Sequence, residues 1–238
     1  MSDAGTQLTL TVVDGSEVLT FVPQRLVVAG YTARDETAAH AHIAELAEIG
    51  VPPPPSIPTF YHLDPGLLTT AAAVEAGGAN TSGEVEPVLV RHGGRWFIGV
   101  GSDHTDRDLE RQDIGDSKAA CPKPLGKLVA RLPADLEDGA FDAAWDQAAA
   151  RSRVDGADYQ TGQLATLRTP SDLLTRLAKE LGSDTVWPDD LVVYAGTLPL
   201  LDGEFKPGAG WELTLTLQLA EGPTTLSHTY DVTRRRRR

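Results

Sequence analysis

Alternating apolar and polar positions recur along the chain and predict β-strands. Near the N-terminus, LTLTVV and EVLTFVP flank Asp14-Gly15, which indicates a hairpin within about residues 1–24. SRVDGADYQTG indicates a second hairpin around Asp155-Gly156, and the strict alternation of WELTLTLQLA predicts a half-exposed strand. RLVVAG, EPVLV and RWFIGVG are apolar runs that we interpret as further strands.

Helical spacing is limited to short stretches. From Thr37 to Ile49, Ala, Glu, Leu and Ile recur with a helical period, and Gly50 follows as a stop signal. The four prolines from Pro52 to Pro55 exclude helix and central strand, so this segment is expected to be a rigid extended connection.

Two later segments also carry helix signals. SDLLTRLAKELG follows Pro170, with Ser171 as the candidate N-cap and Gly182 as the stop. A short helix containing Leu109 is expected, whereas Phe141–Ala150 is compatible with a helix or an irregular connection. The pattern predicts an α+β fold dominated by strands, a sandwich or barrel-like roll with a few short helices, as one domain over residues 1–233.

Composition narrows the class of protein. The chain has 238 residues, 41% of them hydrophobic and 23% charged, and a formal net charge of −13. This charge argues against nucleic acid or an anionic membrane as a partner, and no apolar run is long enough to span a bilayer. The N-terminus lacks a signal-peptide pattern and Cys121 is the single cysteine, so we expect a cytoplasmic protein. Residues 234–238, all arginine, are expected to be a disordered tail.

Three acidic residues form the first candidate site. Glu84 and Glu86 in SGEVEPVLV are two residues apart, so in a strand both side chains point to one face. Adjacent carboxylates repel each other unless a cation lies between them. WFIGVG predicts a neighbouring strand, and Asp103 follows it closely enough to supply a third oxygen ligand. The spacing indicates a magnesium or manganese site, although such acidic pairs also occur on solvated strand faces.

Several separated segments, in this order, resemble the fumarylacetoacetate hydrolase superfamily over about residues 25–230. They are HIAE at 42–45, EVE at 84–86, SDHTDRD at 102–108, SK at 117–118, DGADYQTG at 155–162 and GTLP at 196–199. The resemblance implies the β-rich roll of that superfamily, a divalent-metal enzyme and a homodimer. Its metal ligands correspond here to Glu84, Glu86 and Asp103, and its metal is usually magnesium.

The resemblance also implies roles for other residues. Lys118 matches a lysine that contacts the substrate or the developing anion, although an ordinary surface lysine would look the same. His42 and Glu45 match a pair that orients and deprotonates water; His40 is a competing candidate for the base. Gly196, Thr197 and Gln160 would line the substrate site.

The residues near Asp103 carry no separate catalytic signal. His104 is adjacent to Asp103, and neighbouring strand residues face opposite ways, so we do not expect it to be a ligand. Arg107 is expected to form a structural ion pair with Asp106 or Asp108, and Cys121 to be a small buried hydrophobe. The four tryptophans are expected to fill the core or its edges: Trp96, Trp145, Trp187 and Trp211.

The pattern departs from the superfamily before the histidine. Gly30-Tyr31-Thr32 lies twelve residues ahead of His42, where a related element is usually about six ahead, and Thr59-Phe60-Tyr61-His62 lacks the lysine of a Phe-x-Lys-Pro element. We therefore expect a divergent branch. The leading hypothesis is metal-dependent hydrolysis of a carbon–carbon bond in a 2-oxo or 2,4-dioxo carboxylic acid. The alternatives are decarboxylation, hydration or dehydration of such an acid, and a binding protein that has lost the chemistry.

Overall fold

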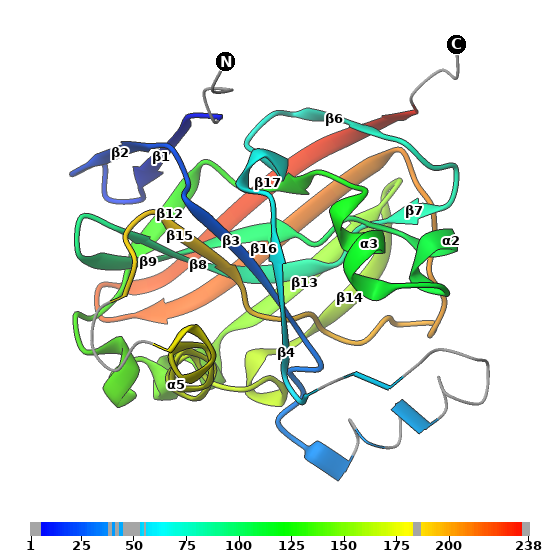
Figure 1. Ribbon diagram of the computed structural model, residues 1–238. Helices are drawn as coiled ribbons and strands as arrows, with labels where there is room; N and C mark the ends of the chain where they lie inside the picture. Colours follow the sequence, from blue (N-terminus) through cyan, green and yellow to red (C-terminus); the bar gives the residue numbers. More distant parts are fainter. Residues whose placement is uncertain are drawn as a thin grey trace, which may run out of the picture.

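Two β-sheets packed face to face form the body of the protein (Figure 1). The computed structural model describes residues 6–37, 40, 43–44, 53–54, 56–182 and 187–234. The core between the sheets takes side chains from both, such as Val27 and Leu89 from one and Leu213 and Leu215 from the other. The predicted strand-dominated sandwich with a few short helices is confirmed.

The larger sheet is mixed, and its central strands are buried on both faces. Successive residues of one strand enter different clusters: Val27 and Ala29 face the inter-sheet core, whereas Leu26 and Val28 join a second cluster on the opposite face. This explains why RLVVAG is continuously apolar. Its strands, in spatial order, are β2 (Val18–Phe21), β1 (Leu8–Val12), β12 (Leu128–Arg131), β9 (Arg95–Ser102), β8 (Val85–His92), β15 (Leu191–Tyr194), β3 (Arg25–Gly30) and β4 (Thr59–Leu63).

The smaller sheet keeps one face toward solvent. Trp211, Leu213, Leu215 and Leu217 are buried in the core, and the alternate positions of the same strand are exposed or partly exposed, as the sequence pattern predicts. Its strands, in spatial order, are β14 (Ala157–Gln163), β13 (Ala149–Val154), β16 (Gly210–Leu219), β17 (Gly222–Arg234) and β6 (Ala73–Ala76).

Both predicted hairpins are present, as β1–β2 and β13–β14. Helix α5 (Pro170–Leu181) ends at Gly182 as expected, but its N-cap is Thr169, whose hydroxyl accepts from the amide of Asp172. The prediction of Ser171 was wrong because Pro170 occupies the first helical position, so the capping residue must precede it. Phe141–Ala150 resolves into helix α4 (Asp142–Gln147) followed by the start of β13.

Two short helices lie together beside the sheets. Figure 1 shows α2 (Arg107–Glu110) and α3 (Ile114–Ala119) side by side, on the side of the sheets away from α5. Two small ladders and three 3-10 turns complete the described elements: β7 (Thr81–Ser82) with β10 (Thr105–Asp106), β5 (Leu68–Thr69) with β11 (Lys123–Pro124), η1 (Pro65–Leu67), η2 (Leu136–Asp138) and η3 (Leu164–Thr166).

The described tryptophans and the cysteine lie where the sequence predicts. Trp96, Trp145 and Trp211 are buried, and Trp187 is partly buried with its ring edge-to-face against Trp96. Cys121 is buried, and burial raises the pKa of its thiol to about 11. In the described part of the chain, no helix is long and apolar enough to cross a membrane.

Candidate active site

The β8–β9 ladder brings the three predicted acidic residues to one place. Val85 pairs with Ser102 and Glu86 with Gly101, and the amide of Asp103 donates to the carbonyl of Glu84 at 3.0 Å. Glu86 and Asp103 are fully buried, while the Glu84 side chain retains 13% exposure. The predicted strand pairing is confirmed, and Asp103 lies just past the end of β9.

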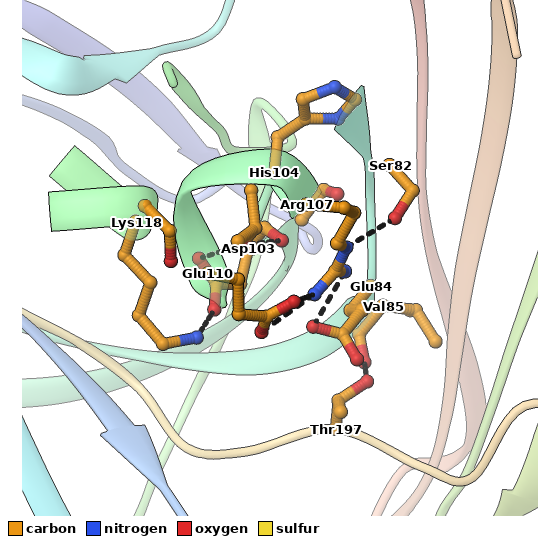
Figure 2. A network of polar contacts seen from close by, with 12 residues as sticks. Ser82, Glu84, Val85, Asp103, His104, Arg107, Glu110, Lys118 and Thr197 are labelled. Atoms are coloured by element: carbon orange, nitrogen blue, oxygen red, sulfur yellow. Dashed lines mark hydrogen bonds and ion pairs between the residues drawn. The ribbon is translucent and has the colours of Figure 1, made fainter. Parts of the chain in front are cut away.

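Two lysines hold the carboxylate of Asp103. Lys118 Nζ forms an ion pair with Asp103 Oδ2 (Figure 2), and Lys123 Nζ lies 3.2 Å from Asp103 Oδ1. Thr105 is also close, with its hydroxyl 3.5 Å from Oδ1. The alternative interpretation of Lys118 as an ordinary surface lysine is excluded, because this residue is only 7% exposed.

A backbone amide holds Glu86. Gly196 N donates to Glu86 Oε2 at 2.8 Å, which connects β8 to the segment after β15. Gly196 has a φ of +104°, and a Cβ there would lie 1.7 Å from Thr32 Oγ1. This position therefore requires glycine. The predicted site residue Gly196 thus contacts one of the predicted metal ligands.

Arg107 connects Glu84 to helix α2. Its Nη2 lies 3.1 Å from Glu84 Oε2, its Nη1 contacts both carboxylate oxygens of Glu110, and its Nε donates to Ser82 (Figure 2). The ring of Phe205 covers the guanidinium, with a Cζ-to-centroid distance of 3.5 Å.

The prediction that Arg107 pairs with Asp106 or Asp108 was wrong. Asp106 caps α2 by accepting from the amides of Asp108 and Leu109. Asp108 accepts from the side-chain amide of Asn80. Sequence neighbours on a helix diverge, whereas Glu110, three positions on, lies on the same face as Arg107.

The pKa shifts divide the cluster into ionised groups and one group that favours its proton. Burial alone would lower the pKa of Lys118, but Asp103, Glu84 and Glu86 raise it, so its ammonium stays charged. Burial would raise the pKa of Asp103, but Lys118 and Lys123 hold it well below its usual range. The pKa of Glu86 is raised, first by burial and then by the charge of Asp103. Lys118 and Lys123 therefore compensate Asp103, whereas Lys118 and the amide of Gly196 offset only part of the effects that raise the pKa of Glu86.

His104 belongs to a buried network behind the site. Its Nδ1 lies 3.1 Å from the Tyr230 hydroxyl and its Nε2 lies 3.0 Å from Thr81 Oγ1, while Tyr230 donates to Ser102. Burial lowers the pKa of His104 to about 3, and repulsion from Lys123 and Arg107 adds to this effect. This neutral imidazole supports the segment after β9 from inside the core.

Gln160 holds the segment that contains Thr197. Its amide oxygen accepts from Val85 N and Ser152 Oγ, each at 2.9 Å, and its amide nitrogen donates to Thr197 Oγ1 and the carbonyl of Leu198. Thr197 in turn donates to the carbonyl of Val85. Both residues therefore lie beside β8 and next to Gly196, and their role in substrate binding stays a prediction.

The sequence reasoning missed Tyr61, Lys123, Glu110 and Phe205. The ring of Tyr61 lies 5.6 Å from Lys118 Nζ, measured to its centroid, and its pKa is raised to about 12, mainly by burial. A signal was present only for Glu110, which lies three residues after Arg107 on a predicted helix. Tyr61 and Phe205 come from segments distant in sequence from Lys118 and Arg107, and Lys123 is distant in sequence from Asp103.

The geometry of the three carboxylates bears on the predicted metal site. Three carboxylates suit a hard divalent cation, and such an ion would oppose the burial and the charge of Asp103 that raise the pKa of Glu86. However, among the described residues no group of three acidic, histidine or cysteine side chains is arranged to hold a metal ion. Arg107 and Lys118 already contact oxygens of Glu84 and Asp103. The donor chemistry fits, but a bound ion would have to share these oxygens with the two side chains.

The predicted water-activating pair cannot be placed. His42 and Glu45 lie outside the described residues. His40, the competing candidate, is exposed. The assignment of the general base therefore stays a prediction.

Solved structures with this fold come from several organisms. A protein from Oleispira antarctica assigned as a fumarylacetoacetate isomerase/hydrolase superposes with a TM-score of 0.63 at 17% identity, covering 94% of this chain and 99% of the other. The 5-carboxymethyl-2-hydroxymuconate delta-isomerase of Mycobacterium smegmatis gives 0.57 at 16%, covering 92% and 86%. A 2-keto-3-deoxyarabinonate dehydratase gives 0.55 at 17%, covering 90% and 75%. The protein therefore has the fumarylacetoacetate hydrolase fold, and the low identities agree with the divergent branch predicted above.

The sequence itself assigns the chain to a narrower family. Residues 29–230 match the family described as "Protein of unknown function (DUF2848)", so the chain belongs to that family. A search of curated proteins finds no match.

Proposed function

We propose that this protein is an enzyme that hydrolyses a carbon–carbon bond in a 2-oxo or 2,4-dioxo carboxylic acid with the help of magnesium or manganese. The observation that carries the proposal is the buried ammonium of Lys118 among Asp103, Glu84 and Glu86. Similar folds occur in proteins described as a hydrolase-family member, an isomerase and a dehydratase, and this range supports an enzyme acting on an oxo acid.

Each residue has a defined part in the proposed reaction. Glu84, Glu86 and Asp103 would hold the cation, which when bound would supply charge that favours an enolate. Lys118, kept protonated by its carboxylates, would bind the anion that develops as the bond breaks. His42 and Glu45 would take a proton from the attacking water. The water oxygen would add to the carbonyl carbon, and the electron pair of the cleaved bond would remain on the enolate until it is protonated.

Dehydration or decarboxylation of a similar acid is the second candidate. The similarity to a 2-keto-3-deoxyarabinonate dehydratase favours it. The two reactions differ in their need for an attacking water. Replacing His42 with alanine should abolish hydrolysis but leave much of a decarboxylase activity. A cytoplasmic homodimer that acts on a small carboxylate is part of the same proposal.

Calorimetric titration with Mg²⁺ and Mn²⁺ tests the metal site. Glu86→Gln should weaken binding by more than the roughly 10- to 100-fold that loss of an outer-shell partner costs. Glu221→Gln, at an exposed position, is the matched control. Wild-type protein that binds neither ion at millimolar concentration would reject the metal and favour a non-catalytic binding protein. A screen of acylpyruvates, oxaloacetate and related 2-oxo acids then tests the substrate class.

A further inference from the structure

The two lysines that contact Asp103 differ in their exposure. The Lys118 side chain is 9% exposed and contacts Oδ2 from the last turn of α3. Lys123 contacts Oδ1 from β11 and is completely enclosed. A small molecule in the site can therefore approach Lys118 but not Lys123.

The Lys123 ammonium connects two segments through backbone carbonyls. It donates to the carbonyl of His104 at 2.6 Å, directly after Asp103, and to the carbonyl of Lys118. It also donates to the carbonyl of Cys121 at 3.3 Å. An ammonium has three hydrogens, and here they are shared among three carbonyls and one carboxylate. One buried charge thus joins the segment of Asp103 to the end of the helix that carries Lys118.

Neighbouring elements fix the backbone of Lys123. The hydroxyl of Tyr194, on β15, lies 3.1 Å from the carbonyl of Lys123 and 2.9 Å from that of Pro124. Lys123 is also paired with Leu68 in the β5–β11 ladder. The ammonium therefore acts from a rigid support, whereas α3 has only six residues and would be marginal without such contacts.

We propose that Lys123 is a positioning residue, which holds the Asp103 carboxylate and the Lys118-bearing end of α3 at a fixed separation. The inference rests on the proposed roles of Lys118 and Asp103. Lys123 acts through these two residues and touches neither substrate nor metal. The Lys118 side chain is then already oriented when an anion binds, so binding does not include the entropic cost of ordering it.

Hydrogen exchange of the protein without added metal or substrate tests this role. In Lys123→Met, amides of residues 114–121 should exchange at least about tenfold faster, while those of β16 stay within about twofold of wild type. Lys127→Met removes a lysine charge from an exposed position nearby and should change neither region. Equal acceleration in α3 and β16 would show a general loss of stability and overturn the proposal, as would no change in α3. If Lys123→Met does not fold, Lys123→Gln keeps a donor without the charge and is measured in its place.

A double-mutant cycle separates positioning from simple packing. If Lys123 acts through Asp103, its replacement should accelerate exchange in α3 much less in Asp103→Asn than in wild type. Equal factors in the two backgrounds would contradict the proposal.

Binding of oxalate in the presence of Mn²⁺ supplies the functional measurement. Lys123→Met should weaken it about tenfold, with Lys127→Met again as control. Unchanged oxalate affinity in Lys123→Met would overturn the proposal. Wild-type protein that binds no oxalate would count against the proposed function, while the exchange results would still decide the role of Lys123.

Discussion

Ion pairs around Asp103 and on the outer face of the smaller sheet have similar chemistry but opposite surroundings. On β13, β14 and β16, Arg151 and Arg153 meet Asp158 and Glu212 with side chains that are 38–51% exposed. Around Asp103, both lysines and the carboxylate are nearly or fully enclosed. Water and salt screen the ion pairs on the outer face of the smaller sheet, so each of these pairs contributes about 0–1 kcal/mol to stability. In the buried cluster each charge depends on its partners, because removing one leaves another uncompensated.

Asp103→Asn should reveal the difference between the two regions most clearly. It removes the charge of the carboxylate that the buried ammonium groups of Lys118 and Lys123 both contact, and we expect a loss of about 3–5 kcal/mol in the free energy of unfolding. The matched change on the outer face of the smaller sheet, Asp158→Asn, should reduce the free energy of unfolding by at most about 1 kcal/mol. Denaturant unfolding of both variants provides the measurement. Similar losses would show that burial does not separate the two regions.

The buried His104 should make the stability of the folded protein depend on pH. Its pKa is lowered to about 3 in the folded protein, so its contribution is fully present above the ordinary value near 6.5 and is lost as the pH falls. Between pH 6.5 and 5, wild type should lose about 2 kcal/mol more unfolding free energy than His104→Gln. Unfolding at several pH values tests this, with His62→Gln at the surface as control. Parallel curves for wild type and His104→Gln would refute the assignment.

Replacing Phe205 should have a smaller effect on stability, because Phe205 covers Arg107 but lies in an exposed loop. Phe205→Ala removes the ring from the guanidinium and should reduce the free energy of unfolding by about 1 kcal/mol. Leu201→Ala, at an exposed position in the same connection, should change it less. The same denaturant assay compares them, and equal effects would mean that the contact with Arg107 adds nothing.

Much of the fold follows from local patterns. Alternation along WELTLTLQLA, the turn at Asp155-Gly156 and the stop at Gly182 each depend on near neighbours in sequence, and each is confirmed. The two-residue spacing of Glu84 and Glu86 and the place of Asp103 after β9 also follow from strand geometry. The position of His42 and Glu45 is not decided by the described residues.

The sequence by itself determined most of the long strands and which acidic residues meet at the end of β8 and β9. Only the tertiary structure decided how those charges are compensated: Arg107 contacts Glu84 in addition to Glu110, and Lys123, between two prolines, reaches Asp103. Strand and helix periods are set by local backbone geometry, so they can be read from nearby residues. The partner of a buried charge depends on which distant segments the packed sheets bring together, and the spacing of residues along the chain does not contain that information.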